Sequence, residues 1–218
     1  MSILRIIRKL RERPIFAAII VSLIAVIIIV GALIFRYGFL YLRIKSTGVS
    51  LKPSVEITPR AVTYYLQNDP KWASEPLGAS GSTLGGAGCL VSSIASAMSY
   101  HGLNYTPQEI NGLFTENGVY TENGKVIWIN IKNAIPEMDY EYSRVFDSGT
   151  IESLLMEGLL PIIEVKVRGI GISHWVTVIG SDGVDFLIMD PLNQSKTPSK
   201  LSVHGNRAYA YRVLIKLI

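Results

Sequence analysis

The sequence has only one cysteine, Cys89, among its 218 residues. A single thiol excludes an intramolecular disulfide, so a folded domain in this chain must be held together by packing alone. The sequence also has no internal repeat and no low-complexity stretch, which excludes a solenoid or a repeat array. The position of the one thiol therefore needs an explanation of its own.

Acidic residues are scarce in the first 60 residues, which hold Glu12 and Glu56 against ten lysines and arginines. Residues 61–218 show the reverse, with 11 basic and 15 acidic side chains and a net charge of −4. The overall charge of +4 and the sequence pI of about 9.1 therefore come from the N-terminal segment. A nucleic-acid-binding domain carries its positive charge on the folded part, so we expect no nucleic acid as a partner.

Residues 15–35, IFAAIIVSLIAVIIIVGALIF, are uncharged and long enough to cross the roughly 30 Å hydrocarbon core of a bilayer as a helix. The run is too long for a typical signal peptide, and no Ala-x-Ala site follows it, so we expect a retained anchor. Basic residues are dense before it and sparser after it: Arg5, Arg8, Lys9, Arg11 and Arg13 against Arg36, Arg43, Lys45 and Lys52. This asymmetry predicts a single-pass protein of the cell membrane, with residues 1–14 as a basic cytoplasmic tail and the rest of the chain outside the cytoplasm.

The segment 36–60 has no sustained hydrophobic period and contains Gly48, Pro53 and Pro59, which predicts a linker. Residues 61–218 then remain, and they are enough for one domain with a real core. In this domain the helical patterns come first. We expect helices over 89–100, from a capping box at Thr106 to near Gly118, over 125–134, and around 151–158.

The hydrophobic period changes after Pro161, where short β-branched or aromatic runs are divided by Gly, Asp and Asn. The runs are PIIEVKVR, SHWVTVIGS, DFLIMD and AYAYRVLIKL, and they predict antiparallel strands. Helices followed by strands indicate an α+β domain with two segregated halves.

Cys89 follows the glycine-rich stretch LGGAG and stands at the start of a predicted buried helix. The free N–H groups and the positive end of the helix dipole favour a thiolate there. The glycines would let a substrate backbone approach closely. The alternative is a structural cysteine, buried as a small apolar side chain.

A nucleophilic cysteine needs a base, and the candidates are His101, His174 and His204. His101 lies about three turns further along the same helix and cannot reach Cys89. His204 lies in a polar turn, where we expect it to be solvated. His174 opens the strand HWVTVIG and could face the helix, although an ordinary core or surface histidine is the simpler interpretation.

Two further residues could complete the site. Asp190 ends the next strand, in LIMDP, and could orient the imidazole of His174. Gln67, 22 residues before Cys89, could donate its amide to an oxyanion together with the Cys89 backbone N–H. Taken singly, Asp190 could be an Asp-Pro turn and Gln67 a loop residue.

Six segments occur in the order seen in the C39-like cysteine peptidases: YLQNDPKW, GAGCLVSSIASAMSYHG, TPQEI, TIESLLMEGLLPIIEV, SHWVTVIGSDG and LIMDP. The resemblance covers residues 62–192, and this family comprises papain-like relatives of the bacteriocin-leader double-glycine peptidases. It implies a papain-like α+β fold, with Cys89 as nucleophile, His174 as base, Asp190 as orienting residue and Gln67 as oxyanion donor.

The sequence departs from the family where members often read Gly-Cys-Gly-Pro-Thr-Ser, since this chain has Gly-Cys-Leu-Val-Ser-Ser at residues 88–93. This change affects the floor of the pocket and leaves the four catalytic positions intact. The sequence shows no ATP-binding cassette, so we do not expect a role in bacteriocin export.

These observations predict a bacterial, membrane-anchored cysteine peptidase or amide hydrolase that needs no metal and no organic cofactor. Its substrate would be a peptide or protein, with the cell envelope as one source. Two alternatives stay open. One is a catalytically silent papain-like domain that binds peptides or cell-wall material, and the other is an acyl transferase of the transpeptidase or transglutaminase kind that uses the same triad.

Overall fold

The computed structural model describes residues 14–217, so nearly all of the predicted basic tail lies outside the described residues. The chain divides into two compact units, with the boundary between Arg43 and Ile44. The first unit contains most of helix α2 (Pro14–Thr47). Within Ala18–Thr47, the most apolar 18-residue window has a mean hydropathy of 3.3 and no buried residues, so this helix is long and apolar enough to span a membrane.

The linker predicted over 36–60 is ordered instead. Helix α2 continues to Thr47 and ends before Gly48, which adopts a positive φ of 68°. The following residues form β1 (Val49–Ser50) and β2 (Glu56–Ile57), which pair antiparallel with β8 (Arg207–Ala208) and β5 (Ser173–Asp182). Leu51 is fully buried between these strands. The expected tether is therefore largely part of the folded unit.

The helices of the second unit are α3 (Leu84–Ala87), α4 (Cys89–Tyr100), α5 (Pro107–Glu116), α6 (Ile131–Ala134) and α7 (Ser148–Met156). Helix α4 is buried along most of its length, as predicted, and the capping box of Thr106 and Glu109 starts α5. The helix expected over 125–134 is shorter, because Tyr120 and Val126 form a β-bridge. Only a 3-10 turn at Trp128–Asn130 and α6 remain helical.

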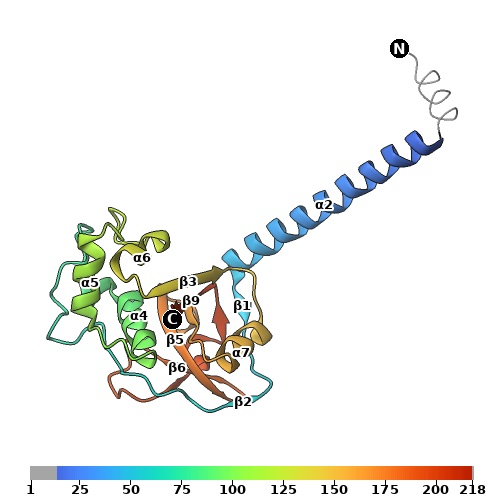
Figure 1. Ribbon diagram of the computed structural model, residues 1–218. Coiled ribbons are helices and arrows are strands. Elements are labelled where there is room, and N and C mark those ends of the chain that lie inside the picture. The colour runs from blue at the N-terminus through green and yellow to red at the C-terminus, as the bar shows by residue number, and fades with distance from the viewer. Residues whose placement is uncertain (1–13, 218) are drawn as a thin grey trace. The chain divides into compact units, whose positions relative to one another are not determined.

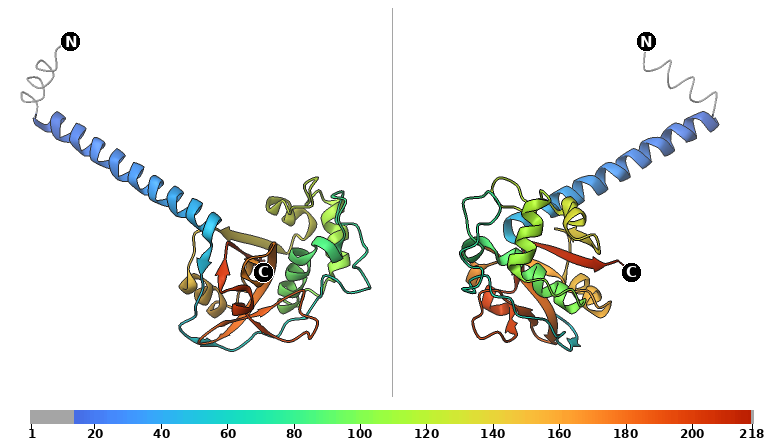
Figure 2. Two further views of the ribbon diagram at one scale, coloured as in Figure 1. Left: turned by 180° about the vertical axis from the view of Figure 1, so that it is seen from behind. Right: turned by 60° about the vertical axis from the view of Figure 1, so that its left-hand side comes forward.

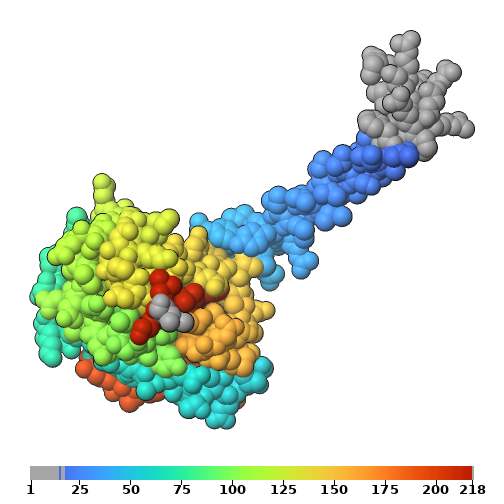
Figure 3. Space-filling model, viewed as in Figure 1, coloured from blue at the N-terminus to red at the C-terminus, as the bar shows by residue number. Residues whose placement is uncertain are grey.

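One antiparallel sheet forms the other half of the unit, in the order β3-β9-β4-β5-β6-β7. Its strands are β3 (Met138–Ser143), β9 (Ala210–Lys216), β4 (Ile162–Lys166), β5, β6 (Phe186–Met189) and β7 (Ser199–Lys200). Figure 1 shows α4 against this sheet, with α5 and α6 further out, and Figure 2 shows the same layers from two other sides. On the face drawn in Figure 3, β9, coloured red, reaches the surface between yellow and orange segments. The predicted α+β class is confirmed.

Two hydrogen bonds fix the start of α4 against the centre of the sheet. The Ser93 hydroxyl donates to the Trp175 carbonyl at 3.0 Å, and the Thr177 hydroxyl donates to the Ser93 carbonyl at 3.1 Å. Ser93 is one turn after Cys89, and Trp175 follows His174 directly. The same contacts that attach the helix to β5 therefore place the thiol close to the histidine.

Candidate active site

Cys89 is the first residue of α4, and its free thiol is half-buried in the wall of a cavity of about 520 Å³. Two of the three glycines before Cys89 are required by close packing within the chain and not by space for a ligand. A Cβ on Gly85 would lie 2.8 Å from the Ala73 carbonyl oxygen, and one on Gly88 would lie 2.5 Å from the carbonyl oxygen of Leu84. Gly86 alone among the three lines the cavity and has room beside it.

His174 lies at the start of β5 and is only 2% exposed, while its ring lines the same cavity. Its Nε2 is 2.7 Å from Asp190 Oδ1, which leaves Nδ1 as the nitrogen for the Cys89 thiol. Burial by itself lowers the pKa of His174, but hydrogen bonds with Asp190 and Cys89, and their charges, raise it to about 9. These contacts therefore favour the protonated imidazolium form of His174.

Asp190 follows β6 and is 7% exposed. Its Oδ1 also accepts the Leu192 N–H at 2.8 Å, and its Oδ2 lies 3.1 Å from His204 Nε2. Burial raises the pKa of the Asp190 carboxyl, but the hydrogen bonds from both histidines outweigh this effect and hold the pKa well below its usual range. Asp190 is therefore an ionised hydrogen-bond acceptor for Nε2 of His174.

The expectation that His204 is solvated is wrong. His204 ends the 3-10 helix Leu201–His204, is 5% exposed, and contacts the oxygen of Asp190 that His174 leaves open. Its neighbour Leu201 is fully buried, and Asp185 accepts the Ser202 N–H at 3.2 Å, so the whole turn folds onto β6. The sequence carries only a weak signal for this contact with Asp190, namely that His204 lies close to a predicted strand.

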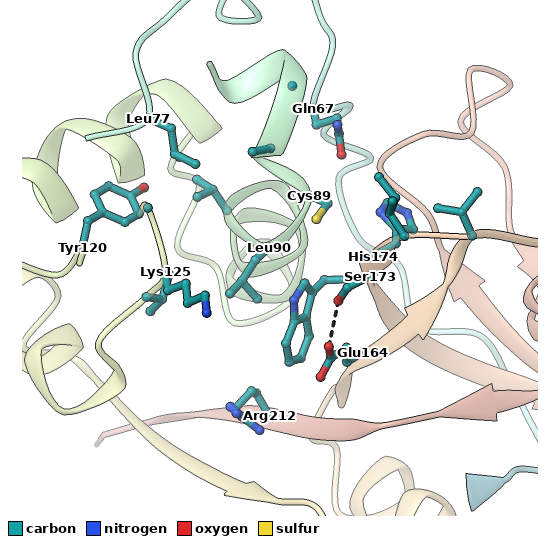
Figure 4. A pocket seen from close by; sticks show the side chains of 18 of the residues that line it. Gln67, Leu77, Cys89, Leu90, Tyr120, Lys125, Glu164, Ser173, His174 and Arg212 are labelled. Atoms are coloured by element: carbon teal, nitrogen blue, oxygen red, sulfur yellow. Dashed lines mark hydrogen bonds between the residues drawn. The ribbon is translucent and has the colours of Figure 1, made fainter. Parts of the chain in front are cut away.

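Gln67 is 6% exposed and lines the cavity beside Cys89. Its backbone N–H donates to the Pro191 carbonyl at 3.1 Å, which ties it to the residue after Asp190. Its side-chain Nε2 donates to the Gly85 carbonyl at 2.9 Å, while Oε1 is buried without a partner. In Figure 4 this oxygen is the end of the amide that points toward Cys89.

The structure thus brings all four predicted site residues together: Gln67, Cys89 and His174 in one cavity wall, and Asp190 behind His174. His101, as expected, lies at the far end of α4, where its carbonyl accepts a hydrogen bond from Lys216.

Among the residues that the structure describes, one group could hold a metal ion, namely His174, Asp190 and His204, whose ligand atoms lie within 4.8 Å of one another. Both Nε2 atoms already lie at hydrogen-bonding distance from Asp190, at 2.7 and 3.1 Å. At these distances, each imidazole ring donates a hydrogen bond from Nε2 to the Asp190 carboxylate. A metal ion bound there would replace those protons and separate His174 from Asp190.

Comparisons with known proteins give matches among solved structures. No protein-family model matches the chain, and no curated protein matches it. A putative C39-like peptidase from Bacillus anthracis matches with a TM-score of 0.47 and 14% identity, over 72% of this chain and 98% of that one. The peptidase domain of Streptococcus ComA, a bi-functional ABC transporter involved in quorum sensing, matches with a TM-score of 0.44 and 18% identity, over 59% and 90%.

Proposed function

We propose that this protein is a cysteine peptidase or amide hydrolase. The arrangement of His174 carries the proposal. Its Nε2 lies 2.7 Å from Asp190 Oδ1, and the other ring nitrogen is available to hydrogen-bond with the thiol of Cys89. A thiolate beside an imidazolium is the activated form of a cysteine nucleophile. Both groups open into a cavity, so an amide substrate can reach them.

In the first half of the reaction, the Cys89 thiolate attacks the carbonyl carbon of the amide, and the carbonyl π electrons move to oxygen. The resulting oxyanion accepts hydrogen bonds from the N–H groups at the start of α4. Gln67 adds a donor once its side-chain amide turns so that an N–H replaces Oε1 on the side that faces Cys89. His174 then gives its proton to the leaving nitrogen as the C–N bond breaks, and a thioester to Cys89 remains.

In the second half, water attacks the thioester and His174 takes one of its protons. The C–S bond then breaks, which releases the acid and restores the thiolate–imidazolium pair. Throughout, Asp190 keeps the imidazole oriented and provides the counter-charge. Its low pKa supports this role, because the carboxylate stays ionised while His174 gains and loses its proton.

We further propose that α2 anchors the enzyme in the cell membrane, with the N-terminus in the cytoplasm and the catalytic unit outside. The length and hydropathy of α2 support the anchor. The excess of basic residues before it supports the orientation.

The proposal is tested with the full-length protein in detergent. A peptide bearing a vinyl sulfone should label the wild type covalently, and Cys89→Ala and His174→Ala should each abolish or greatly slow labelling. Incubation with a proteome-derived peptide mixture should then give new N-termini with the wild type only. Products that form only with an added amine would favour acyl transfer, and labelling without any product would favour a peptide-binding domain.

A further inference from the structure

The cavity wall has two sides, with the Cys89 thiol between them. Figure 4 shows His174 on one side of the thiol, and Leu77 with Tyr120 on the other. In the reaction proposed above, His174 gives its proton to the leaving nitrogen. The substrate residue that carries this nitrogen, the leaving residue, therefore lies on the His174 side. The side chains beside His174 determine which leaving residue fits there.

Two apolar side chains flank His174 in the cavity wall. Ile172 lies two residues before His174 in the chain. Leu192 donates its N–H at 2.8 Å to Asp190, the residue that holds the His174 ring. Ile172 is 79% exposed and Leu192 is 38% exposed, so both have apolar surface that a ligand can cover. Removal of such surface from water is favourable.

The polar side chain next to Ile172 is already engaged. Ser173 separates Ile172 from His174, and its hydroxyl donates to Glu164 at 2.7 Å. Glu164 also pairs with Arg144 at 3.4 Å, so its charge is compensated within the wall. The surface beside His174 therefore offers a leaving residue apolar contact and not an ionic partner.

The loop that carries Ile172 is held in place by hydrogen bonds. It leaves β4 through the 3-10 turn Val167–Gly169 and returns directly to β5. The Val167 N–H donates to the Ile172 carbonyl at 3.1 Å, and the Arg168 N–H donates to His204 Nδ1 at 3.3 Å. A surface that is formed in advance loses little conformational entropy when it binds a ligand.

We propose that Ile172 and Leu192 form a subsite for a large apolar leaving residue, directly after the bond that Cys89 attacks. The inference rests on the proposed peptidase function and specifies its substrate class. The substrates are peptides or proteins with a residue such as leucine, isoleucine or phenylalanine at this position. Its side chain covers the exposed surfaces of Ile172 and Leu192 while its nitrogen faces His174.

The test uses the full-length protein in detergent with a proteome-derived peptide mixture, because each cleavage reports its leaving residue as a new N-terminus. Leucine, isoleucine and phenylalanine should be enriched among the new N-termini relative to their frequency in the mixture. One cleaved peptide is then synthesised with either leucine or alanine as the leaving residue. The wild type should cleave the leucine peptide about tenfold faster, in kcat/KM, because a few buried methylene groups give a difference of this size.

Ile172→Ser should lower this ratio to about twofold, because the apolar surface of the subsite is lost. Ile170→Ser is the matched control. Ile170 lies in the same loop and is 91% exposed, but it does not line the cavity. Both variants replace an exposed isoleucine by serine, so the core stays intact in each. Ile170→Ser should keep the wild-type ratio.

Each outcome bears on one proposal or on both. New N-termini with the composition of the mixture, or with an excess of acidic or basic residues, would overturn the subsite and leave the peptidase function standing. Equal ratios in Ile170→Ser and Ile172→Ser would overturn the subsite as well. Failure of the wild type to cleave any peptide would overturn both proposals.

Discussion

His204 Nε2 lies 3.1 Å from Asp190 Oδ2, the carboxylate oxygen opposite the one that faces His174. The other ring nitrogen of His204 accepts the Arg168 N–H at 3.3 Å. Because the Arg168 N–H occupies Nδ1, the proton that His204 donates to Asp190 is on Nε2. Asp190 is thus held from both sides, by His174 toward the cavity and by His204 from behind.

This relationship predicts different effects for two substitutions of His204. Asparagine retains an acceptor near the Nδ1 position but has no donor to Asp190, whereas glutamine can place an N–H near the Nε2 position. We expect His204→Asn to lower kcat roughly tenfold with little change in KM, because one hydrogen bond that orients Asp190 is lost. His204→Gln should recover most of the activity.

Steady-state kinetics on peptides cleaved by the wild type check this prediction, with melting temperatures measured beside them. Equal loss of kcat in both variants would show that His204 matters only as a buried ring.

The raised pKa of His174 predicts how the reactivity of Cys89 depends on pH. His174 stays protonated up to a pH of about 9, so iodoacetamide should alkylate Cys89 at pH 6 much faster than it alkylates a free thiol. His174→Ala should slow this reaction and move its pH dependence toward that of an ordinary cysteine, with a midpoint near 8.5. Mass spectrometry of the alkylated protein gives the rates. A wild-type profile identical to that of His174→Ala would contradict the ion pair.

The same pKa also predicts the pH dependence of stability. A folded-state pKa raised from 6.5 to about 9 contributes stability that is complete below pH 6.5 and is lost as the pH rises through 9. The wild type should therefore lose more of its melting temperature between pH 6 and 10 than His174→Gln does. Thermal unfolding of both proteins at a series of pH values makes the comparison, and parallel curves would contradict it.

Asp190→Asn should lower turnover by roughly three to four orders of magnitude, because the amide favours the wrong tautomer of His174 and removes its counter-charge. Asparagine keeps an acceptor oxygen, so the protein should still fold. Asp139→Asn is the control, since Asp139 is half-buried on the edge strand β3, far along the chain from Asp190, and pairs with Lys132. Asp185 is unsuitable, because its carboxylate supports the turn that carries His204. Turnover that matched in the two variants would remove Asp190 from the mechanism.

The single cysteine is also a reporter of membrane topology. Cys89 lines an open cavity, so a membrane-impermeant maleimide should label the wild type in intact cells if the catalytic unit lies outside, and Cys89→Ala should not be labelled. Labelling that appears only after lysis would reverse the predicted orientation of α2. The rate before and after lysis, measured by gel shift, gives the result directly.

Features that depend on neighbouring residues follow directly from the amino-acid sequence. The start of α4 at Cys89, the capping box at Thr106 and the strands around His174 and before Asp190 are all encoded in short local patterns. Propensity, capping and hydrophobic period depend on residues within one or two helical turns along the chain, so they predict these elements without any knowledge of the fold. These patterns made Cys89, His174 and Asp190 candidates, and the resemblance to the C39-like peptidases added support for Gln67 and implied the role of each residue.

Features that depend on long-range pairing arise only in the folded chain. Residues 49–50 and 56–57 form strands because β8 and β5 pair with them, and the edge strand β3 forms because β9 supplies its partner. Gln67 reaches the site through its bond to Pro191, and His204 is buried because its turn folds onto β6. No local pattern encodes such contacts, since the favourable energy comes from surfaces that meet only after the chain has folded.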